Sequence, residues 1–573
     1  MTPDPGRQAR TSATLPDAAG DLAGALDLLL ADGALGVLRR FRPDGATLRL
    51  AVGLARRPHQ VAGQAASLAA ELARIARGRS QIGPERKDRR FADPAWSQNP
   101  LLKRAMQAYL ASGRAAENLL AVADLDWRDD ERLRFVLMNL IAAASPSNNP
   151  LLSPAAIKSL VDTGGLSAAR GLRALVSDLA MAPRVPSMVE PGAFAVGTDL
   201  AVTPGSVVYR TDMFELIQYA PTTEQVSKYP LIIVPPMINK YYITDLAHGR
   251  SMSEFLVSEG HQVFAISWRN PDYRHRDWDL NSYGAAIVDA LATARAITGA
   301  AKASVCALCS GGIVSAMVAA HLNQLGQLDT VASLCLGVTV LDQARAGTAG
   351  AMIDEATAAA AMAASKARGY LDGRTLAEVF AWLRPDDLIW NYWVNNYLQG
   401  RPPPAFDILY WNADTTRLPA ALHHDFIRLG LDNSLVKPDA ATMLGSPVDL
   451  SKVDSDAYVV AGIADHLCPW QSCYRTTQLL GGPVTFVLST SGHIASMVNP
   501  PDNPKATFQL ADENPADPAA WLGTATTMSG SWWPHYSAWL TARSGGTRKR
   551  RARAGSKEFA VLCPAPGTYV HDR

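Results

Sequence analysis

The sequence predicts an α/β fold in which a mostly parallel, doubly wound sheet carries an inserted cap and follows a helical N-terminal domain. Three observations predict it. Short apolar segments alternate with helical ones beyond residue 190, an aromatic-rich insertion interrupts them, and the first part of the chain has helical periodicity. The predicted strands are nearly continuous apolar runs, which is typical of strands covered by helices on both faces. These strands are Ser206–Tyr209, Phe214–Tyr219, Leu231–Val234, Val263–Ser267, Ala303–Leu308, Val331–Val338, Tyr458–Ala461 and Val484–Leu488.

The N-terminal part is expected to be a helical domain over residues 21–190, preceded by a polar, Pro- and Ala-rich segment, residues 1–20, that is expected to be disordered. Val61–Arg77 and Leu101–Ala123 repeat apolar residues at three- and four-residue spacing, as amphipathic helices do. We find no constellation of catalytic residue types in this part of the sequence.

A catalytic domain is predicted for residues 191–545, with the cap inserted at about residues 342–446. The cap begins Ala-rich and then becomes dense in aromatic residues: Trp382, Trp390, Tyr392, Trp393, Tyr397, Tyr410 and Trp411. We interpret most of them as the cap's own core, although a cap would also keep water away from a reactive acyl-enzyme. Residues 546–573 form a basic C-terminal tail, which we interpret as a solvated linker in preference to a contact with an anionic surface.

Composition excludes several classes of function. The 54 Lys and Arg residues nearly balance the 53 Asp and Glu residues, so the net charge of +1 gives no electrostatic case for nucleic acid. The six cysteines are irregularly spaced and predict neither a disulfide framework nor a metal site, and Cys306-x-x-Cys309 lacks a second pair of ligands. Free thiols fit a reducing cytoplasm. Neither a secretory signal nor a transmembrane segment is predicted.

Cys309 is the most informative residue of the chain. It lies in Ala307-Leu308-Cys309-Ser310-Gly311-Gly312, after an apolar strand and before a helical run. This pattern predicts a nucleophile elbow, a sharp strand-to-helix turn that raises a nucleophile above the sheet and turns the next backbone N–H groups toward one oxyanion. Ala307 departs from the glycine that such elbows prefer, and its methyl group is expected to strain the turn.

An acid and a base follow this nucleophile along the chain. Asp465 and His493 each come directly after a predicted strand, and the order nucleophile, acid, base is the order of the α/β-hydrolase fold. His493 is expected to take the proton of the Cys309 thiol, because only the thiolate is a good nucleophile. Asp465 would either hold the imidazole tautomer or assist the hydroxyl of a second substrate.

Further positions are candidates for binding roles. The backbone N–H of Ser310 is the first expected oxyanion donor, and Met237 or Ile238, in the loop after Leu231–Val234, is expected to supply the second. Asn239, in the same loop, is a candidate for contacting the substrate or a residue that does. Lys240 and Arg269 would either contact an anionic substrate tail or form structural ion pairs, and the sequence does not separate these alternatives.

These motifs together resemble polyhydroxyalkanoate synthases, the polymerases that make bacterial storage polyester. The resemblance runs from about Arg89 to the C-terminus. It rests on Val234–Pro236, Ile238–Tyr242 with Asn239, Ser267–Pro271, the Cys309 motif, Trp390–Tyr392, Phe406–Ile408, Asp465-His466, Gly492–Ile494 and Asn499–Pro501. His466 matches the family without an evident role.

The resemblance implies a reaction and its setting. The family uses a Cys–His–Asp triad, which maps onto Cys309, His493 and Asp465. A 3-hydroxyacyl-CoA would acylate Cys309 and release CoA, and the hydroxyl of a second unit or of the growing chain would then attack the thioester. No cofactor is implied, because CoA is part of the substrate and the leaving group. The resemblance further implies a cytoplasmic homodimer on the surface of polyester granules.

The sequence leaves open the branch of the synthase family and two rival functions. Motifs such as Trp390–Tyr397, Asp414–Ala421 and Pro469–Arg475 look like the medium-chain (class II) branch, while the short-chain (class I) branch shares the same triad. One rival is a polyester depolymerase or thioesterase of the same fold, which would need water at the acyl-enzyme. The other is an inactive granule-coating relative, in which Cys309 would be unreactive.

Overall fold

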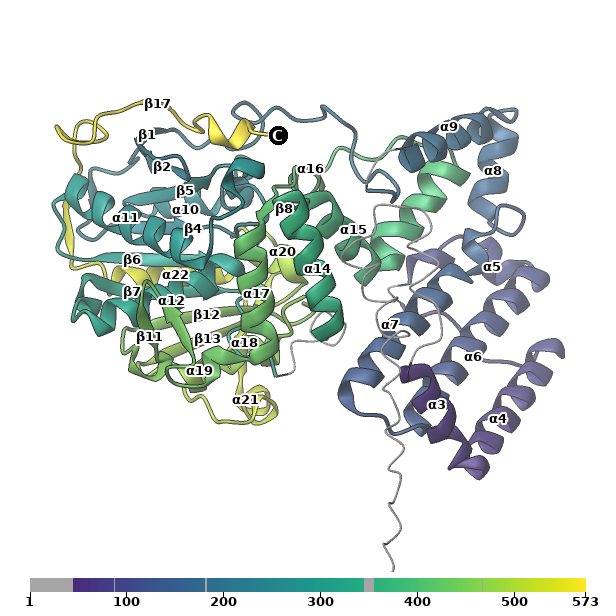
Figure 1. Cartoon of the computed structure of the whole chain (residues 1–573). Helices are drawn as coiled ribbons and strands as arrows, with labels where there is room; N and C mark the ends of the chain where they lie inside the picture. Colours follow the sequence, from purple (N-terminus) through teal and green to yellow (C-terminus); the bar gives the residue numbers. More distant parts are fainter. Residues whose placement is uncertain (1–44, 87, 181–182, 345–354, 466) are drawn as a thin grey trace, which may run out of the picture.

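The computed structural model describes residues 45–573 except 87, 181–182, 345–354 and 466. The disorder expected for residues 1–20 therefore concerns a segment outside the described residues. Figure 1 shows a helical N-terminal region beside a sheet-containing region, with the helices of the cap between them.

The second region is built on one eleven-stranded sheet with the strand order β15-β14-β13-β12-β7-β6-β4-β5-β2-β1-β17. The six neighbours from β13 to β5 run parallel, and the strands outside them pair antiparallel. The mostly parallel sheet predicted from the sequence is confirmed. The strands are β1 (Gly205–Arg210), β2 (Phe214–Tyr219), β4 (Leu231–Val234), β5 (Val263–Trp268), β6 (Ala303–Leu308), β7 (Val331–Gly337), β12 (Ala457–Gly462), β13 (Val484–Ser489), β14 (Thr507–Leu510), β15 (Thr526–Ser529) and β17 (Cys563–Pro564).

Burial explains which strands the sequence revealed. Every residue of β4, β5, β6 and β12 is buried, because helices such as α11 (Leu280–Thr298), α12 (Ser310–Gln324) and α22 (Trp532–Thr541) cover the sheet. Strand β15, at one edge, is exposed along its whole length and carries Thr and Ser, so it has no apolar signal. The edge strands β15 and β17, and β14 next to β15, were not predicted from the sequence.

The N-terminal region consists of helices with clear local signals. α4 and α6 confirm the helices expected around Val61–Arg77 and Leu101–Ala123. Asn99 caps α6 by accepting hydrogen bonds from two backbone N–H groups, and Asp126 does the same for α7. The helices are α3 (Gly45–Ala55), α4 (Pro58–Ala76), α5 (Ala95–Gln98), α6 (Pro100–Val122), α7 (Trp127–Ala143), α8 (Pro154–Asp162) and α9 (Leu166–Ala180).

The cap is largely helical and includes two π-helices that hold Trp390, Trp393 and Tyr397. Its main elements are α14 (Glu355–Arg368), α15 (Gly373–Leu383), the π-helices η6 (Asp386–Trp390) and η7 (Trp393–Leu398), α16 (Asp407–Ala413) and α17 (Ala420–Asp432). Figure 1 places α14 and α17 in front of the sheet-containing region and α15 next to the helical region.

The aromatic cluster of η6 and η7 docks the cap onto the N-terminal helices. The Trp393 indole N–H donates to the Asn148 carbonyl at 3.2 Å, and the Tyr397 hydroxyl donates to Asp178 at 2.6 Å. A side chain at Gly171 of α9 would collide with the Tyr397 carbonyl oxygen, so only glycine permits this close approach. The interpretation of most cap aromatics as the cap's own core is therefore wrong for this cluster, because sequence periodicity marks a buried face without identifying what covers it.

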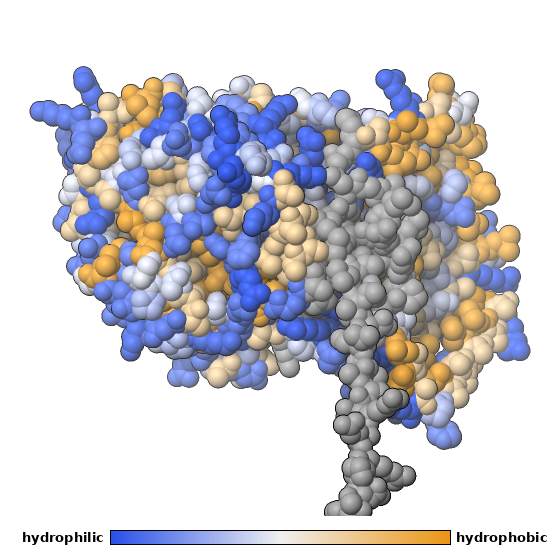
Figure 2. All heavy atoms as spheres, viewed as in Figure 1, coloured by the Kyte–Doolittle hydropathy of each residue, from blue (hydrophilic) through white to orange (hydrophobic). Residues whose placement is uncertain are grey.

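Exposed apolar side chains gather on the helical region. Figure 2 shows them over α8 and α9, where Leu151, Val161, Leu166 and Leu172 are all more than 60% exposed. Among the described residues, no helix combines the length and the apolar character that crossing a membrane requires.

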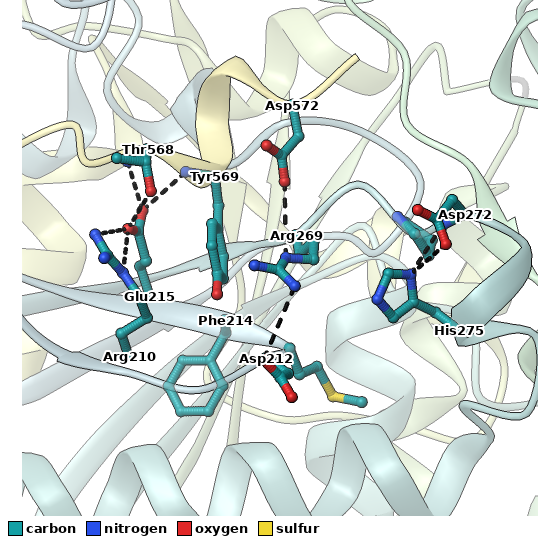
Figure 3. Close-up of polar contacts among 12 residues, drawn as sticks. Arg210, Asp212, Phe214, Glu215, Arg269, Asp272, His275, Thr568, Tyr569 and Asp572 are labelled. Carbon is teal, nitrogen blue, oxygen red and sulfur yellow. Dashed lines mark hydrogen bonds and ion pairs between the residues drawn. The ribbon is translucent and has the colours of Figure 1, made fainter.

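The C-terminal segment is packed against the catalytic region, which corrects the prediction of a solvated linker. β16 (Thr547–Lys549), within the basic run, pairs antiparallel with β3 (Gln225–Ser227), and β17 extends the main sheet next to β1. Its last residues close over Glu215 of β2, a carboxylate with no exposed side-chain surface (Figure 3). Backbone pairing and buried charge hold this segment, and neither is visible in its basic composition.

Glu215 satisfies four donors at once. It accepts hydrogen bonds from the Thr568 backbone N–H and hydroxyl and from the Tyr569 backbone N–H, at 2.8–3.0 Å, and from the Arg210 guanidinium at 2.8 Å. Gly567 approaches so closely that a side chain there would meet the Glu215 carboxylate. Glu215 thus ties the C-terminus to the sheet.

Replacing Glu215 with alanine is expected to destabilise the protein by about 3 kcal/mol, because it leaves Arg210 and two backbone N–H groups without their buried acceptor. Asp212→Asn is the matched control. Asp212 lies 4.0 Å from Arg269 with its side chain 97% exposed, so its loss should cost less than about 0.5 kcal/mol. The check is urea unfolding of both variants, and equal midpoints would contradict the role given to Glu215.

Candidate active site

Cys309 lies at a strained turn between β6 and α12. Its backbone has φ 50° and ψ −119°, a conformation that a non-glycine residue adopts only where its surroundings enforce it. The two glycines that follow Ser310 allow the turn to pack against neighbouring segments. A side chain at Gly311 would lie 2.6 Å from the Pro235 carbonyl oxygen, and one at Gly312 would collide with Thr339. The predicted elbow geometry is therefore present, and its tightness accounts for both glycines.

Ala307 does not carry the strain expected of it. It is an ordinary member of β6, paired with Val234 on one side and Leu336 on the other. The strain lies at Cys309 instead, because the chain reverses only after Leu308. The departure from glycine at position 307 thus leaves the turn intact.

Asp465 and His493 meet at the carboxyl ends of neighbouring strands, where sites of open α/β sheets form. Asp465 follows β12, and His493 begins α20 (His493–Met497) after β13. The Asp465 Oδ2 lies 2.7 Å from His493 Nδ1, and its Oδ1 accepts the backbone N–H groups of Leu467 and Cys468, each at 2.9 Å. Both carboxylate oxygens are engaged and the side chain is fully buried, which fits a group that orients the imidazole.

Cys309 completes the group together with a second thiol, that of Cys468. The Sγ atoms of Cys309 and Cys468 and a ring nitrogen of His493 all lie within 4.8 Å of one another. Cys468 is not among the site residues predicted from the sequence. The sequence signal that was available is the position of Cys468 three residues after the predicted acid Asp465. Its backbone N–H donates to the Asp465 carboxylate.

Leu467, next to Cys468, contacts the other parts of the molecule. It packs against a cluster built on Phe135 of α7 and Leu383 of α15, and also against the main core. The sheet-containing region, the cap and the N-terminal helices therefore meet at Leu467.

The electrostatics of the group favour a thiolate beside an imidazolium. The Cys468 thiol and the His493 imidazole both hydrogen-bond to Cys309 and hold the pKa of its thiol well below the usual value, against the effect of burial. Burial opposes the charged form of His493, but the Asp465 carboxylate outweighs it and raises the pKa of the imidazole to about 10. The interaction with Cys309, together with burial, raises the pKa of the Cys468 thiol.

These shifts predict a flat pH profile for alkylation of Cys309. A lowered pKa keeps the thiol ionised as the pH falls, so the iodoacetamide rate should change less than about twofold between pH 9 and 7. An ordinary thiol with a pKa of about 8.5 should slow about 25-fold over the same interval. The measurement is site-resolved mass spectrometry, with glutathione as the reference thiol. A profile for Cys309 as steep as that of glutathione would contradict the ion pair.

Of the predicted oxyanion donors, Ser310 follows Cys309 directly in the chain and Met237 contacts Ser310. Ser310 begins α12, and its backbone N–H helps to lower the pKa of the Cys309 thiol. The Met237 backbone N–H donates to the Ser310 hydroxyl at 3.0 Å, so this donor already has a partner. Ile238 and Asn239 follow in the same loop, where the Ile238 carbonyl accepts from the Thr416 N–H and Asn239 forms a β-bridge to Thr415.

Lys240 and Arg269 are engaged by the C-terminal end. The Lys240 ammonium donates to the Asp572 carbonyl at 2.5 Å, and burial lowers the pKa of this lysine. Arg269 lies over the Tyr569 ring at 4.2 Å and forms a long ion pair with Asp572 (Figure 3). Of the two alternatives left open, the structure supports structural pairing for both residues. His466 lies outside the described residues.

Comparisons with known proteins agree with this arrangement. The family model described as "Poly-beta-hydroxybutyrate polymerase (PhaC) N-terminus" matches residues 87–256, and the model of the alpha/beta hydrolase fold matches residues 230–500. The chain is 46% identical to Poly(3-hydroxyalkanoate) polymerase 1 of Ectopseudomonas oleovorans, over 90% of this chain and 92% of that protein.

Two further relatives extend the similarity to other bacteria. The polymerase subunit PhaC of Cupriavidus necator is 38% identical over 87% of this chain and 85% of its own length, and the Methylorubrum extorquens polymerase is 40% identical over 85% and 81%. The two family models together cover residues 87–500, a range that includes the elbow at Cys309, the cap, Asp465 and His493. The chain belongs to the poly(3-hydroxyalkanoate) polymerase family.

Proposed function

We propose that this protein polymerises (R)-3-hydroxyacyl-CoA into polyester and releases CoA, with the growing acyl group held as a thioester on Cys309. The observation that carries the proposal is the thiol, imidazole and carboxylate gathered at the strand ends of a chain from the polymerase family. This arrangement has the parts that acyl transfer through a cysteine needs: an ionised nucleophile, a proton carrier and a group that orients it.

The first half-reaction loads the enzyme. The Cys309 thiolate attacks the thioester carbonyl of the substrate, and the carbonyl oxygen gains negative charge. His493, protonated beside the thiolate, then gives its proton to the departing sulfur of CoA. The products are acyl-Cys309, free CoA and a neutral imidazole.

The second half-reaction makes the ester bond. The neutral His493 takes the proton of a 3-hydroxyl group, whose oxygen attacks the acyl-Cys309 carbonyl while the Cys309 thiolate leaves. A thioester suits this step because it stays activated toward a hydroxyl, whereas a serine ester would lie close to the product ester in energy. Asp465 keeps the imidazole oriented through both steps, since its oxygens are engaged and buried.

The Ser310 backbone N–H is the oxyanion donor that the geometry supports best, because it follows the nucleophile at the start of α12. Met237 can join it only by giving up its hydrogen bond to the Ser310 hydroxyl. The proposed reaction needs neither metal nor cofactor, because the CoA thioester itself supplies the activated acyl group.

The setting of the reaction extends the same proposal. We place the protein in the cytoplasm on polyester granules, as a homodimer. The family resemblance supports this setting, and the exposed apolar side chains of α8 and α9 offer a surface for contact with granule or partner. The motifs around Trp390, Asp414 and Pro469 support a preference for medium-chain monomers.

The test is to measure CoA release from a series of short- to medium-chain 3-hydroxyacyl-CoAs while polymer is recovered in parallel. We expect one ester unit in polymer for each CoA released, with the fastest turnover for medium chains. Free 3-hydroxy acid in place of polymer would identify a depolymerase-like hydrolase or thioesterase. No CoA release from any substrate would favour an inactive granule-coating protein.

A further inference from the structure

The second thiol next to the candidate nucleophile helps to lower the pKa of Cys309, but it forms no bond and transfers no proton in the reaction proposed above. The Cys468 Sγ lies within 4.8 Å of both the Cys309 Sγ and the His493 ring, and Cys468 is buried while Cys309 is partly exposed. A partly exposed, ionised thiol beside a buried one is an arrangement in which oxidation of the first can be resolved by the second.

We propose that Cys309 and Cys468 form a reversible disulfide when a hydroperoxide oxidises Cys309. The two sulfurs must close from within 4.8 Å to a bond of about 2.0 Å, and rotation about the two Cα–Cβ bonds is the movement that the proposal requires. Cys468 follows β12 in a loop rather than within a strand, so its side chain can turn without breaking the sheet.

The chemistry balances with hydrogen peroxide as the oxidant. The Cys309 thiolate attacks one peroxide oxygen, an S–O bond forms, the O–O bond breaks, and the departing hydroxide takes the proton of His493 to become water. The neutral imidazole then removes the proton of Cys468, whose sulfur attacks the sulfenic acid of Cys309. An S–S bond forms, and the leaving hydroxide takes that proton as the second water. Two thiols are oxidised by two electrons in total, and the peroxide is reduced.

Such a disulfide would protect the nucleophile. A sulfenic acid that meets no thiol is oxidised further to sulfinic acid, which is not readily reversed, whereas a disulfide is recovered by a dithiol. The enzyme would be inactive while oxidised and fully active after reduction.

Other thiols of the protein provide internal controls. Cys473, five residues beyond Cys468, is buried and its Sγ is directed at the Cys468 carbonyl oxygen at 3.7 Å. Cys306 and Cys335 are paired across β6 and β7, but each is only 1% exposed, so peroxide does not reach them in the folded protein. Cys563 is partly exposed and lies on β17, away from the site.

The experiment treats the purified full chain with a small excess of hydrogen peroxide and maps its cysteines by mass spectrometry before and after dithiothreitol. We expect a peptide pair joined through Cys309 and Cys468, and a loss of CoA release that dithiothreitol restores. A wild-type protein whose activity is not restored, or whose Cys309 is found as sulfinic acid, would overturn the proposal.

Variants separate Cys468 from its neighbours. Peroxide should inactivate Cys468→Ala as it inactivates the wild type. Dithiothreitol should then restore at least about tenfold less activity in the variant than in the wild type, because Cys309 of the variant is oxidised further to sulfinic acid. Cys473→Ala should behave like the wild type. Equal recovery of Cys468→Ala and wild type would exclude the resolving role. The peptide map of the wild type needs no variant and no polymerase activity, so it stands even if Cys468→Ala fails to fold or the proposed function fails.

Discussion

Replacing Cys309 with alanine is expected to abolish both CoA release and polymer formation, by at least about 10⁴-fold. The substitution removes the only atom that the proposed mechanism places in covalent contact with the acyl group. The strained backbone at Cys309 should tolerate alanine, since alanine keeps the Cβ atom of cysteine and adds no atom to the turn. The loss should therefore be one of chemistry, with an unchanged unfolding transition.

Cys473→Ala is the matched control, because it removes a second buried thiol from the same neighbourhood without touching Cys309. We expect it to retain most of the wild-type rate. CoA release followed by a thiol reagent and polymer recovered by solvent extraction give the two readouts. Polymer formation by Cys309→Ala would refute the central assignment, whatever the control shows.

Replacing Asp465 with asparagine is expected to lower kcat by about 10³–10⁴-fold with little change in KM. An amide in place of the buried carboxylate removes the charge that keeps His493 protonated beside the thiolate, and it can present a donor to Nδ1 in place of an acceptor. The pKa of the Cys309 thiol should rise as a result, so alkylation of Cys309 in this variant should slow as the pH falls from 9 to 7.

The same variant distinguishes the two roles considered for Asp465. If it orients the imidazole, both loading and elongation fail, and the initial burst of CoA disappears. If it serves only the incoming hydroxyl, a burst of one CoA per site remains while polymer is lost. Asp454→Asn is the control, because Asp454 is exposed and precedes β12, whereas Asp465 follows that strand. A preserved burst would contradict the orienting role that the buried, fully engaged carboxylate supports.

The sequence by itself determined the parts of the fold in which local pattern and burial coincide. The central strands are apolar along their whole length because helices cover both faces, so β4 and β6 were located to the residue. The elbow around Cys309 could be predicted because a strand, a small-residue turn and a helix follow one another directly. Asp465 and His493 could be predicted because each follows a buried strand, and parallel strands bring their carboxyl ends to one edge of the sheet.

Only the tertiary structure decided the contacts between segments that are distant in the chain and locally ambiguous. Cys468 joins the site because the chain beyond Asp465 brings its thiol next to Cys309, and its position three residues after Asp465 does not by itself predict this contact. The aromatic residues of η7 contact the N-terminal helices rather than the interior of the cap. The C-terminal segment ends in backbone hydrogen bonds to the buried Glu215 carboxylate. Periodicity indicates that a helix face is buried, and composition indicates that a segment is charged. Neither indicates which other segment contacts that face or that charge. Those contacts depend on packing and on the free-energy cost of leaving a buried polar group unpaired, and both are determined only in the complete fold.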